Sequence, residues 1–246
     1  MTGTEGRAAN VAEALEVLRT GEVEVLGLLP YSSNYVFLAR VHAGDDETLA
    51  VYKPRRGERP LWDFPSGTLA AREVAAFEVS EAGGWDIVPP TVLRKDASLG
   101  AGSLQLFVEH DPERHFFTLF EERHADLVAF AAFDVVINNA DRKAGHVIED
   151  ERGHLWGVDH GLAFHVEPKL RTVIWEFADD PLDAGLLARV SAVEAGLVRG
   201  KPLAERLAKL LSREEIAATR DRARSLSTAG RLPLPGPDYH LPWPLV

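Results

Sequence analysis

The sequence of 246 residues contains no cysteine. Disulfide bonds, thiolate zinc sites and a cysteine nucleophile are therefore excluded. Long apolar runs are missing as well. None approaches the roughly 20 residues that a membrane-spanning helix needs, and no apolar core of a signal peptide follows the polar first residues. We therefore expect a cytoplasmic protein without an integral membrane segment.

Basic residues are in short supply, with 27 Lys and Arg against 38 Asp and Glu and a formal net charge of −11. An acidic balance of this size argues against a broad nucleic-acid surface and against a polybasic membrane anchor. We therefore expect no nucleic-acid partner. The fractions of apolar and charged residues, 46% and 26%, are those of an ordinary folded protein.

Several common catalytic motifs are also absent. The Gly-Lys pair is followed by Pro202 where a phosphate-binding P-loop needs Ser or Thr, and neither Gly-x-Gly-x-x-Gly nor Gly-x-Ser-x-Gly occurs. Nine histidines are present, but His-Glu-x-x-His is not. His160 and His165 near Asp159 leave a transition-metal site as a minor alternative.

The patterns that are present divide the chain into two halves. The first half predicts a small, mostly antiparallel sheet with one prominent helix, and the second half is mostly helical. Strands are expected at residues 22–29, 34–42, 47–53, 90–94, 103–109, 147–149 and 155–158, and helices at 8–19, 68–82, 124–138, 182–194, 202–211 and 213–227. We predict an α+β protein with an N-terminal lobe, 1–109, and a C-terminal lobe, 110–246, that ends in a proline-rich tail.

Two charged residues of the first half stand where apolar residues are expected. Lys53 shares a strand face with Leu49 and Val51, and Glu73 lies within the apolar stripe of its helix. A packed ammonium needs an anion and a packed carboxylate needs a cation, so the two side chains are natural partners. A lysine that extends to water and a glutamate paired with Arg72 are the open alternatives.

Two polar clusters follow apolar elements of the second half. Asn-Ala-Asp-Arg at 139–142 comes directly after an apolar helix, and Asp-His-Gly at 159–161 comes after a short apolar strand. Loops on rigid elements are where catalytic groups collect, and a carboxylate at a strand end suits a metal ion. A capping turn and an Asx turn explain the same letters.

The order of these features is more specific than any one of them. A strand Lys, a helix Glu, a loop Asp and a strand-end Asp-x-Gly resemble the residue set of kinases. The chain resembles the bacterial phosphatidylinositol 3- and 4-kinase-like family and, more distantly, the HipA-type kinases. The matching segments, all within residues 22–180, are 50–54, 72–73, 139–142 and 158–164. The resemblance implies a bilobal protein-kinase-like fold and a kinase that binds Mg-ATP between its lobes.

The resemblance also implies residue roles. Lys53 would contact the ATP phosphates and Glu73 would hold Lys53 in place. Asp141 would orient or deprotonate the acceptor, and Asp159 would bind Mg²⁺. Further nucleotide-binding positions implied by the resemblance are Ser32, Ser33 and Asn34 in the phosphate loop and Gln105, Phe107, Val108 and Glu109 in the hinge that meets adenine.

The catalytic loop departs from the usual pattern of this family. Lys143 stands where a His is usual, and His146 stands where an Asn usually binds the metal. We expect His146 to take the metal-binding role, with Mn²⁺ as an alternative to Mg²⁺ because hard Mg²⁺ prefers oxygen ligands. The departures leave two alternatives open: a nucleotide-binding pseudokinase with a regulatory or scaffold role, and transfer of AMP.

The phosphoryl acceptor, a small molecule or a protein, is not identified by the sequence. Lys169 and Arg171 follow the Asp-x-Gly turn, where kinases of this type hold an activation or substrate-binding segment. We expect them to meet an anionic acceptor, with a solvated basic pair as the alternative.

Overall fold

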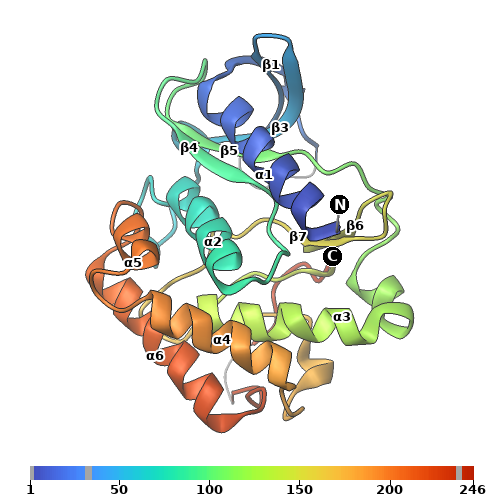
Figure 1. Ribbon diagram of the computed structural model, residues 1–246, viewed down its shortest axis with the longest axis vertical. Helices are drawn as coiled ribbons and strands as arrows, with labels where there is room; N and C mark the ends of the chain where they lie inside the picture. The colour runs from blue at the N-terminus through green and yellow to red at the C-terminus, as the bar shows by residue number, and fades with distance from the viewer. Residues whose placement is uncertain (1–2, 31–34, 237–239) are drawn as a thin grey trace. The chain divides into compact units, whose positions relative to one another are not determined.

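The structure, a computed structural model, describes residues 3–30, 35–236 and 240–246. The chain divides into two compact units. The first unit comprises Met1–Val74 and Pro89–Val108, and the second comprises Ala75–Val88 and Glu109–Val246. Most helices and strands of both units are labelled in Figure 1.

A five-stranded antiparallel sheet of order β1-β2-β3-β5-β4 forms the first unit. Its strands are β1 (Glu22–Leu28), β2 (Phe37–Ala43), β3 (Asp46–Pro54), β4 (Thr91–Arg94) and β5 (Gly102–Leu106). Helix α1 (Gly3–Thr20) packs against the sheet (Figure 1) and buries Val17 and Leu18 against Val41 and Leu104. The predicted small sheet is therefore confirmed, with an apolar core between one of its faces and α1.

The alternation of β3 determines where Lys53 lies. Ala50 and Tyr52 are fully buried in the core, whereas Val51 and Lys53 point to the other face and are only partly buried. Tyr52 donates from its hydroxyl to the Gly100 carbonyl, which fixes the buried face of the strand. Lys53 is thereby held on the face of the sheet opposite to the core.

Helices build most of the second unit. They are α2 (Leu69–Gly83), which belongs to this unit from residue 75 on, α3 (Phe116–Ile137), α4 (Ala184–Gly196), α5 (Pro202–Leu207) and α6 (Arg213–Ala229). A hairpin of β6 (Val147–Glu149) and β7 (Leu155–Gly157) and the short 3₁₀ helices η2 (Ala144–His146) and η3 (Trp175–Phe177) complete the unit, and η1 (Arg55–Gly57) lies in the first. Helices α3, α4 and α6 pack on one another (Figure 1), and the predicted mostly helical second half is confirmed.

The structure differs from the sequence prediction at the start of α3. The helix begins at Phe116 and not near residue 124, because two helical segments join across Arg123, whose φ of −124° is not helical. The sequence pattern detects only the segment after this break. His115 caps the earlier segment, together with Thr118.

The division into two compact units differs in one segment from the predicted lobes. The chain passes to the second unit after Val108, next to the predicted boundary, but Ala75–Val88 belongs to the second unit as well. Trp85 packs edge-on against Phe133 of α3, with 5.4 Å between ring centroids, and the Ile87 carbonyl accepts a hydrogen bond from the Gly157 N–H at 2.6 Å. These contacts attach the segment to the second unit.

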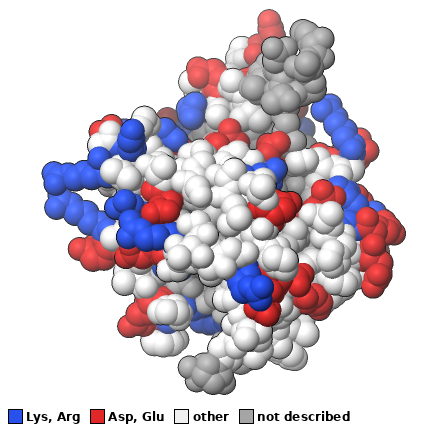
Figure 2. Space-filling view, turned by 60° about the horizontal axis from the view of Figure 1, so that its bottom comes forward, with Lys and Arg blue, Asp and Glu red and all other residues white. Residues whose placement is uncertain are grey.

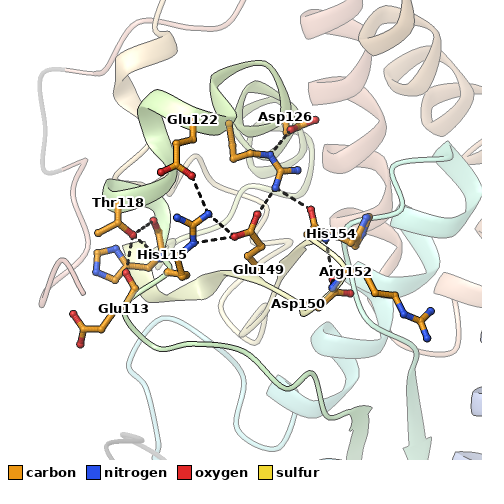
Figure 3. A network of polar contacts seen from close by, with 12 residues as sticks. Glu113, His115, Thr118, Glu122, Asp126, Glu149, Asp150, Arg152 and His154 are labelled. Atoms are coloured by element: carbon orange, nitrogen blue, oxygen red, sulfur yellow. Dashed lines mark hydrogen bonds and ion pairs between the residues drawn. The ribbon is translucent and has the colours of Figure 1, made fainter.

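A charge network joins the start of α3 to the β6–β7 hairpin (Figure 3). The Glu149 carboxylate accepts hydrogen bonds from Arg114, at 2.9 and 2.6 Å, and from Arg123 on its other oxygen. Arg123 also donates to the Gly153 carbonyl in the hairpin turn, at 2.8 Å. The hairpin that leads to Asp159 is thus tied to the helix that leads to Asp141.

A buried ion pair holds the loop after α3. Arg142 and Asp134 are both fully buried, and two guanidinium nitrogens donate to the two carboxylate oxygens at 2.9 Å each. Arg142 also donates to the carbonyls of His146 and Val158, at 3.0 and 3.1 Å, and lies 2.7 Å from Nε2 of His160. One side chain therefore connects α3, η2 and the segment after β7.

No helix in the described ranges is long and apolar enough to cross a bilayer. On the face shown in Figure 2, acidic and basic side chains are interspersed around a broad uncharged area. Mixed signs of this kind produce no strong field of one sign over that face.

Breaking the buried pair has a large predicted effect on stability. Asp134→Asn should lower the free energy of unfolding by about 3–5 kcal/mol, because it leaves a buried guanidinium without its anion. Urea denaturation followed by circular dichroism measures this. The matched control is Glu194→Gln, which removes the exposed pair of Glu194 with Arg224 and should cost about 1 kcal/mol or less. Equal losses in both variants would contradict the structural role of Asp134.

Candidate functional site

Lys53 and Glu73 form an ion pair within the first unit. The Glu73 side chain is 3% exposed and that of Lys53 is 20% exposed. The carboxylate is thus buried, and the lysine side chain is partly exposed. The predicted partnership is confirmed, and its role in holding nucleotide phosphates stays a prediction.

Arg72, the alternative partner of Glu73, contacts Phe64 and Thr68. Its guanidinium lies over the Phe64 ring, 5.0 Å from the centroid, and its Nε donates to the Thr68 hydroxyl at 3.3 Å. The Glu58 carboxylate accepts a hydrogen bond from the Ala70 N–H at 3.1 Å and so satisfies one of the orphan donors at the start of α2. These contacts fix the first turn of the helix, which orients Glu73 towards β3.

The predicted hinge residues begin inside the sheet. Gln105 is paired with both Val51 and Thr91, and its side-chain amide donates to the Thr91 hydroxyl at 2.9 Å. Phe107 donates its N–H to the Leu49 carbonyl at 2.9 Å. The side chain of Gln105 is therefore engaged within the sheet. Its predicted role in nucleotide binding stays a prediction, as part of the hinge segment.

The other residues predicted to bind nucleotide lie after β5 and in the segment before β2. Val108 and Glu109 come after the strand, and their contact with adenine stays a prediction. The predicted phosphate-loop residues Ser32, Ser33 and Asn34 lie outside the described residues.

Asp141 stands on a tight loop in the second unit. Asn138 ends α3 in the left-handed conformation, with φ and ψ of 55°, and the Asn139 side-chain oxygen accepts the Asp141 N–H at 3.0 Å. Asn139 is buried, and its amide donates to Asp134 at 3.0 Å. The Asp134 carboxylate therefore holds this loop through Asn139 and also binds Arg142.

The electrostatics of Asp141 suit a proton acceptor. The pKa of this carboxyl is raised to about 6: burial is the main cause, the nearby Asp159 carboxylate adds to it, and the cations of Lys143 and Arg171 oppose it. Nζ of Lys143 lies 3.5 Å from the Asp141 carboxylate. A general base works best when its pKa lies near the pH at which the enzyme operates.

His146 lies between Asp141 and Asp159. Its Nδ1 is 3.0 Å from the Asp141 carbonyl oxygen and its Nε2 is 3.4 Å from the Asp159 carboxylate. A carbonyl only accepts, so Nδ1 donates in this contact, and Nε2 faces the Asp159 carboxylate. The Lys143 N–H is farther from Nδ1, at 3.5 Å.

The donor atoms of this pair fit a divalent cation that is shared with phosphate oxygens. Asp159, with φ of 58° and a half-exposed side chain, presents an oxygen next to Nε2 of His146. In the described ranges no group of three or more His, Asp or Glu side chains is arranged to hold a metal ion by itself. Mg²⁺ in nucleotide sites is bound by one or two protein ligands plus phosphates, so two donors are sufficient.

The predicted basic pair lies beside the loop that carries Asp141. The Lys169 N–H donates to the Asn138 side-chain oxygen at 2.9 Å, and the Arg171 N–H donates to the Asn139 carbonyl at 3.0 Å. The Arg171 charge also lowers the pKa of Asp141. The backbone contacts hold this segment next to Asp141, and recognition of an anionic acceptor stays a prediction.

Sequence reasoning missed the residues that hold the loop. Asp134 lies in an otherwise apolar helical segment. The signal in the sequence was its position among Phe130, Phe133 and Ile137, all of which are buried in the structure. A carboxylate on such a face requires a cation, and Arg142 is eight residues away. The same reasoning that found Glu73 would have found this pair.

The predicted site residues gather in two groups, each within one unit. Lys53 and Glu73 are together in the first unit. Asp141, His146 and Asp159 are together in the second, within the contacts given above.

The comparisons with solved structures identify the fold. The structure of the Golgi casein kinase with Mn/ADP bound matches with a TM-score of 0.59 at 16% sequence identity, and the match covers 90% of this chain and 75% of that one. Another crystal structure of the Golgi casein kinase gives a TM-score of 0.57 at 16% identity, with 89% and 74% covered. At this identity the likeness shows the fold alone. The chain has a protein-kinase-like α+β fold.

No model of a known protein family matches the chain. Protein Rv2133c of Mycobacterium tuberculosis is 42% identical over 265 aligned residues, which cover 93% of this chain and 94% of that protein. Similarity at this level over nearly the full length of both proteins shows common family, and the chain belongs to the family of Protein Rv2133c.

Proposed function

We propose that the protein is a kinase-like phosphotransferase that uses ATP and a divalent cation. The observation that carries the proposal is the ion pair of Lys53 with the buried Glu73, on a strand and a helix of a protein-kinase-like fold. In kinases a strand lysine held by a helix glutamate contacts the nucleotide phosphates. The finer relationship to the bacterial phosphatidylinositol 3- and 4-kinase-like family is part of the proposal and rests on the matching segments of the sequence.

The residues of the second unit supply the remaining parts of phosphoryl transfer. Asp159 and Nε2 of His146 would hold the divalent cation, which when bound neutralises charge on the phosphates. The presence of Mn and ADP in the related Golgi casein kinase structure supports a nucleotide and a metal here. Asp141 would accept the proton of the acceptor hydroxyl, as its raised pKa allows.

The acceptor would be anionic. Arg171 acts on Asp141 electrostatically, and the Lys169 and Arg171 backbones are fixed to Asn138 and Asn139. A negative group on the acceptor would meet these cations close to the proton-accepting carboxylate. Small molecules and protein side chains both satisfy this requirement.

One observation favours a second candidate, a nucleotide-binding pseudokinase. His146 stands where the resemblance calls for Asn, and its ring contacts both the Asp141 carbonyl and the Asp159 carboxylate. An imidazole that is protonated there would be an internal cation and would compete with a metal ion. A protein of this kind would bind nucleotide without turnover. Analysis of the reaction products also detects AMP transfer, the other alternative.

The first test replaces the proton acceptor. Asp141→Asn should lower the rate of ADP release from Mg-ATP by about 10²–10⁴-fold, because it removes the base, and should leave the affinity for a non-hydrolysable ATP analogue within about twofold. A coupled ADP assay and isothermal titration calorimetry measure the two quantities. Asp126→Asn, an exposed change on α3, is the matched control.

The products decide between the candidate functions. ADP released by the unchanged protein supports the kinase, and pyrophosphate would identify AMP transfer. Binding with thermal stabilisation but without any product would establish the pseudokinase. Equal rates for Asp141→Asn and the unchanged protein would contradict the role of Asp141.

The second test concerns the phosphate contact. Lys53→Met should weaken ADP binding by about tenfold or more, because a charge-assisted contact is lost. Glu73→Gln should weaken it by a smaller factor, because the lysine keeps its charge but loses its support. Lys95→Met, which removes an exposed lysine of the same unit, is the control in calorimetric titrations. An unchanged affinity for Lys53→Met would overturn the assignment.

The third test concerns the metal. Asp159→Asn should remove the dependence of nucleotide binding on the divalent cation, because the carboxylate oxygen is lost. His146→Asn should increase the affinity for Mg²⁺ relative to Mn²⁺, because an amide oxygen replaces an imidazole nitrogen. Titrations with each metal at fixed ADP measure both effects. If the ratio of the Mg²⁺ and Mn²⁺ affinities is the same in His146→Asn as in the unchanged protein, His146 is not a metal ligand.

A further inference from the structure

A pocket of about 680 Å³ lies in the second unit, away from the residues assigned above. It is formed by α6, by the segments 166–168 and 231–234, and by Val135 of α3. Most of its lining is apolar, including Val166, Leu226 and Leu234. Its size is in the range of pockets that bind small molecules.

The charged residues around the pocket differ in their partners. Asp179 and Arg231 form an ion pair with each other at 2.7 Å, and the exposed Asp221 lies 3.7 Å from Arg224. Arg222 makes no ion pair with any residue that the structure describes. Its three hydrogen bonds go to the Val136 carbonyl, the His165 carbonyl and the Thr219 hydroxyl, which are all neutral acceptors.

The guanidinium of Arg222 therefore has no anion within ion-pair distance among the described residues, and the Asp221 carboxylate acts on it only at longer range. Burial lowers the pKa of Arg222 to about 10 despite the opposing effect of Asp221. Nε, Nη1 and Nη2 each donate once, so one N–H remains on each terminal nitrogen. Two N–H groups are the number that the two oxygens of a carboxylate accept.

We propose that this pocket binds a small amphipathic carboxylate, with its apolar body against α6 and segment 231–234 and its carboxylate on Arg222. The apolar lining and a guanidinium without an ion-pair partner together define this class of ligand. An uncharged apolar molecule would leave Arg222 without an ion-pair partner, and a cationic one would be repelled by it. This site is independent of the proposed kinase function.

Sodium decanoate, used below its micelle-forming range, is the probe for binding to the 246-residue chain. Decanoate should raise the melting temperature, and isothermal titration calorimetry should detect saturable binding. Decanol and decyltrimethylammonium, with the same chain and no anion, should give no saturable binding. No binding of decanoate, or equal binding of decanol, would overturn the proposal.

Paired variants on α6 test the two parts of the site. Arg222→Gln should weaken decanoate binding by about tenfold or more, whereas Arg224→Gln should leave it unchanged. Ser225→Trp, which fills the pocket and keeps Arg222, should also abolish binding, whereas Thr228→Trp, outside the lining, should not. If Arg222→Gln fails to fold, the Ser225→Trp and Thr228→Trp pair decides: equal binding by both would place decanoate elsewhere and refute the site.

Discussion

The second unit depends on one buried guanidinium. Arg142 uses all five of its N–H groups, on both oxygens of Asp134, on the carbonyls of His146 and Val158, and on His160. Only a planar fork with five donors makes such contacts at once, so lysine is no substitute at this position. Because Asp141 directly precedes Arg142 and Asp159 directly follows Val158, the two carboxylates of the candidate site are held by the same charge.

Buried charges indicate where sequence reasoning works and where it does not. Lys53 and Glu73 are predictable as partners because each stands on an apolar face and needs a charge of opposite sign, although Arg72 was open as an alternative partner of Glu73. Asp134 follows the same logic but was overlooked within the long apolar run of α3. Local periodicity gave the sheet and most helices, because burial of one face determines it. It did not give the start of α3, because the break at Arg123 interrupts the pattern.

Long-range packing explains the remaining differences. The assignment of Ala75–Val88 to the second unit depends on contacts of Trp85 and Ile87 with residues far along the chain, which no local pattern contains. The same is true of the contact between His146 and Asp159, which follows from the β6–β7 hairpin returning the chain to the loop. His146 and Asp159 were named from the family resemblance, but the contact between them depends on the fold.

The pocket on α6 and the catalytic loop share one point of attachment. The His165 carbonyl accepts hydrogen bonds from Arg222 and from Asn138, at 3.2 and 2.9 Å, and Asn138 ends the helix that leads to Asp141. A carboxylate on Arg222 would draw on the same guanidinium that holds His165. Asn138 in turn accepts a hydrogen bond from the Lys169 N–H, so three hydrogen bonds join Arg222, the end of α3 and the segment that carries Lys169.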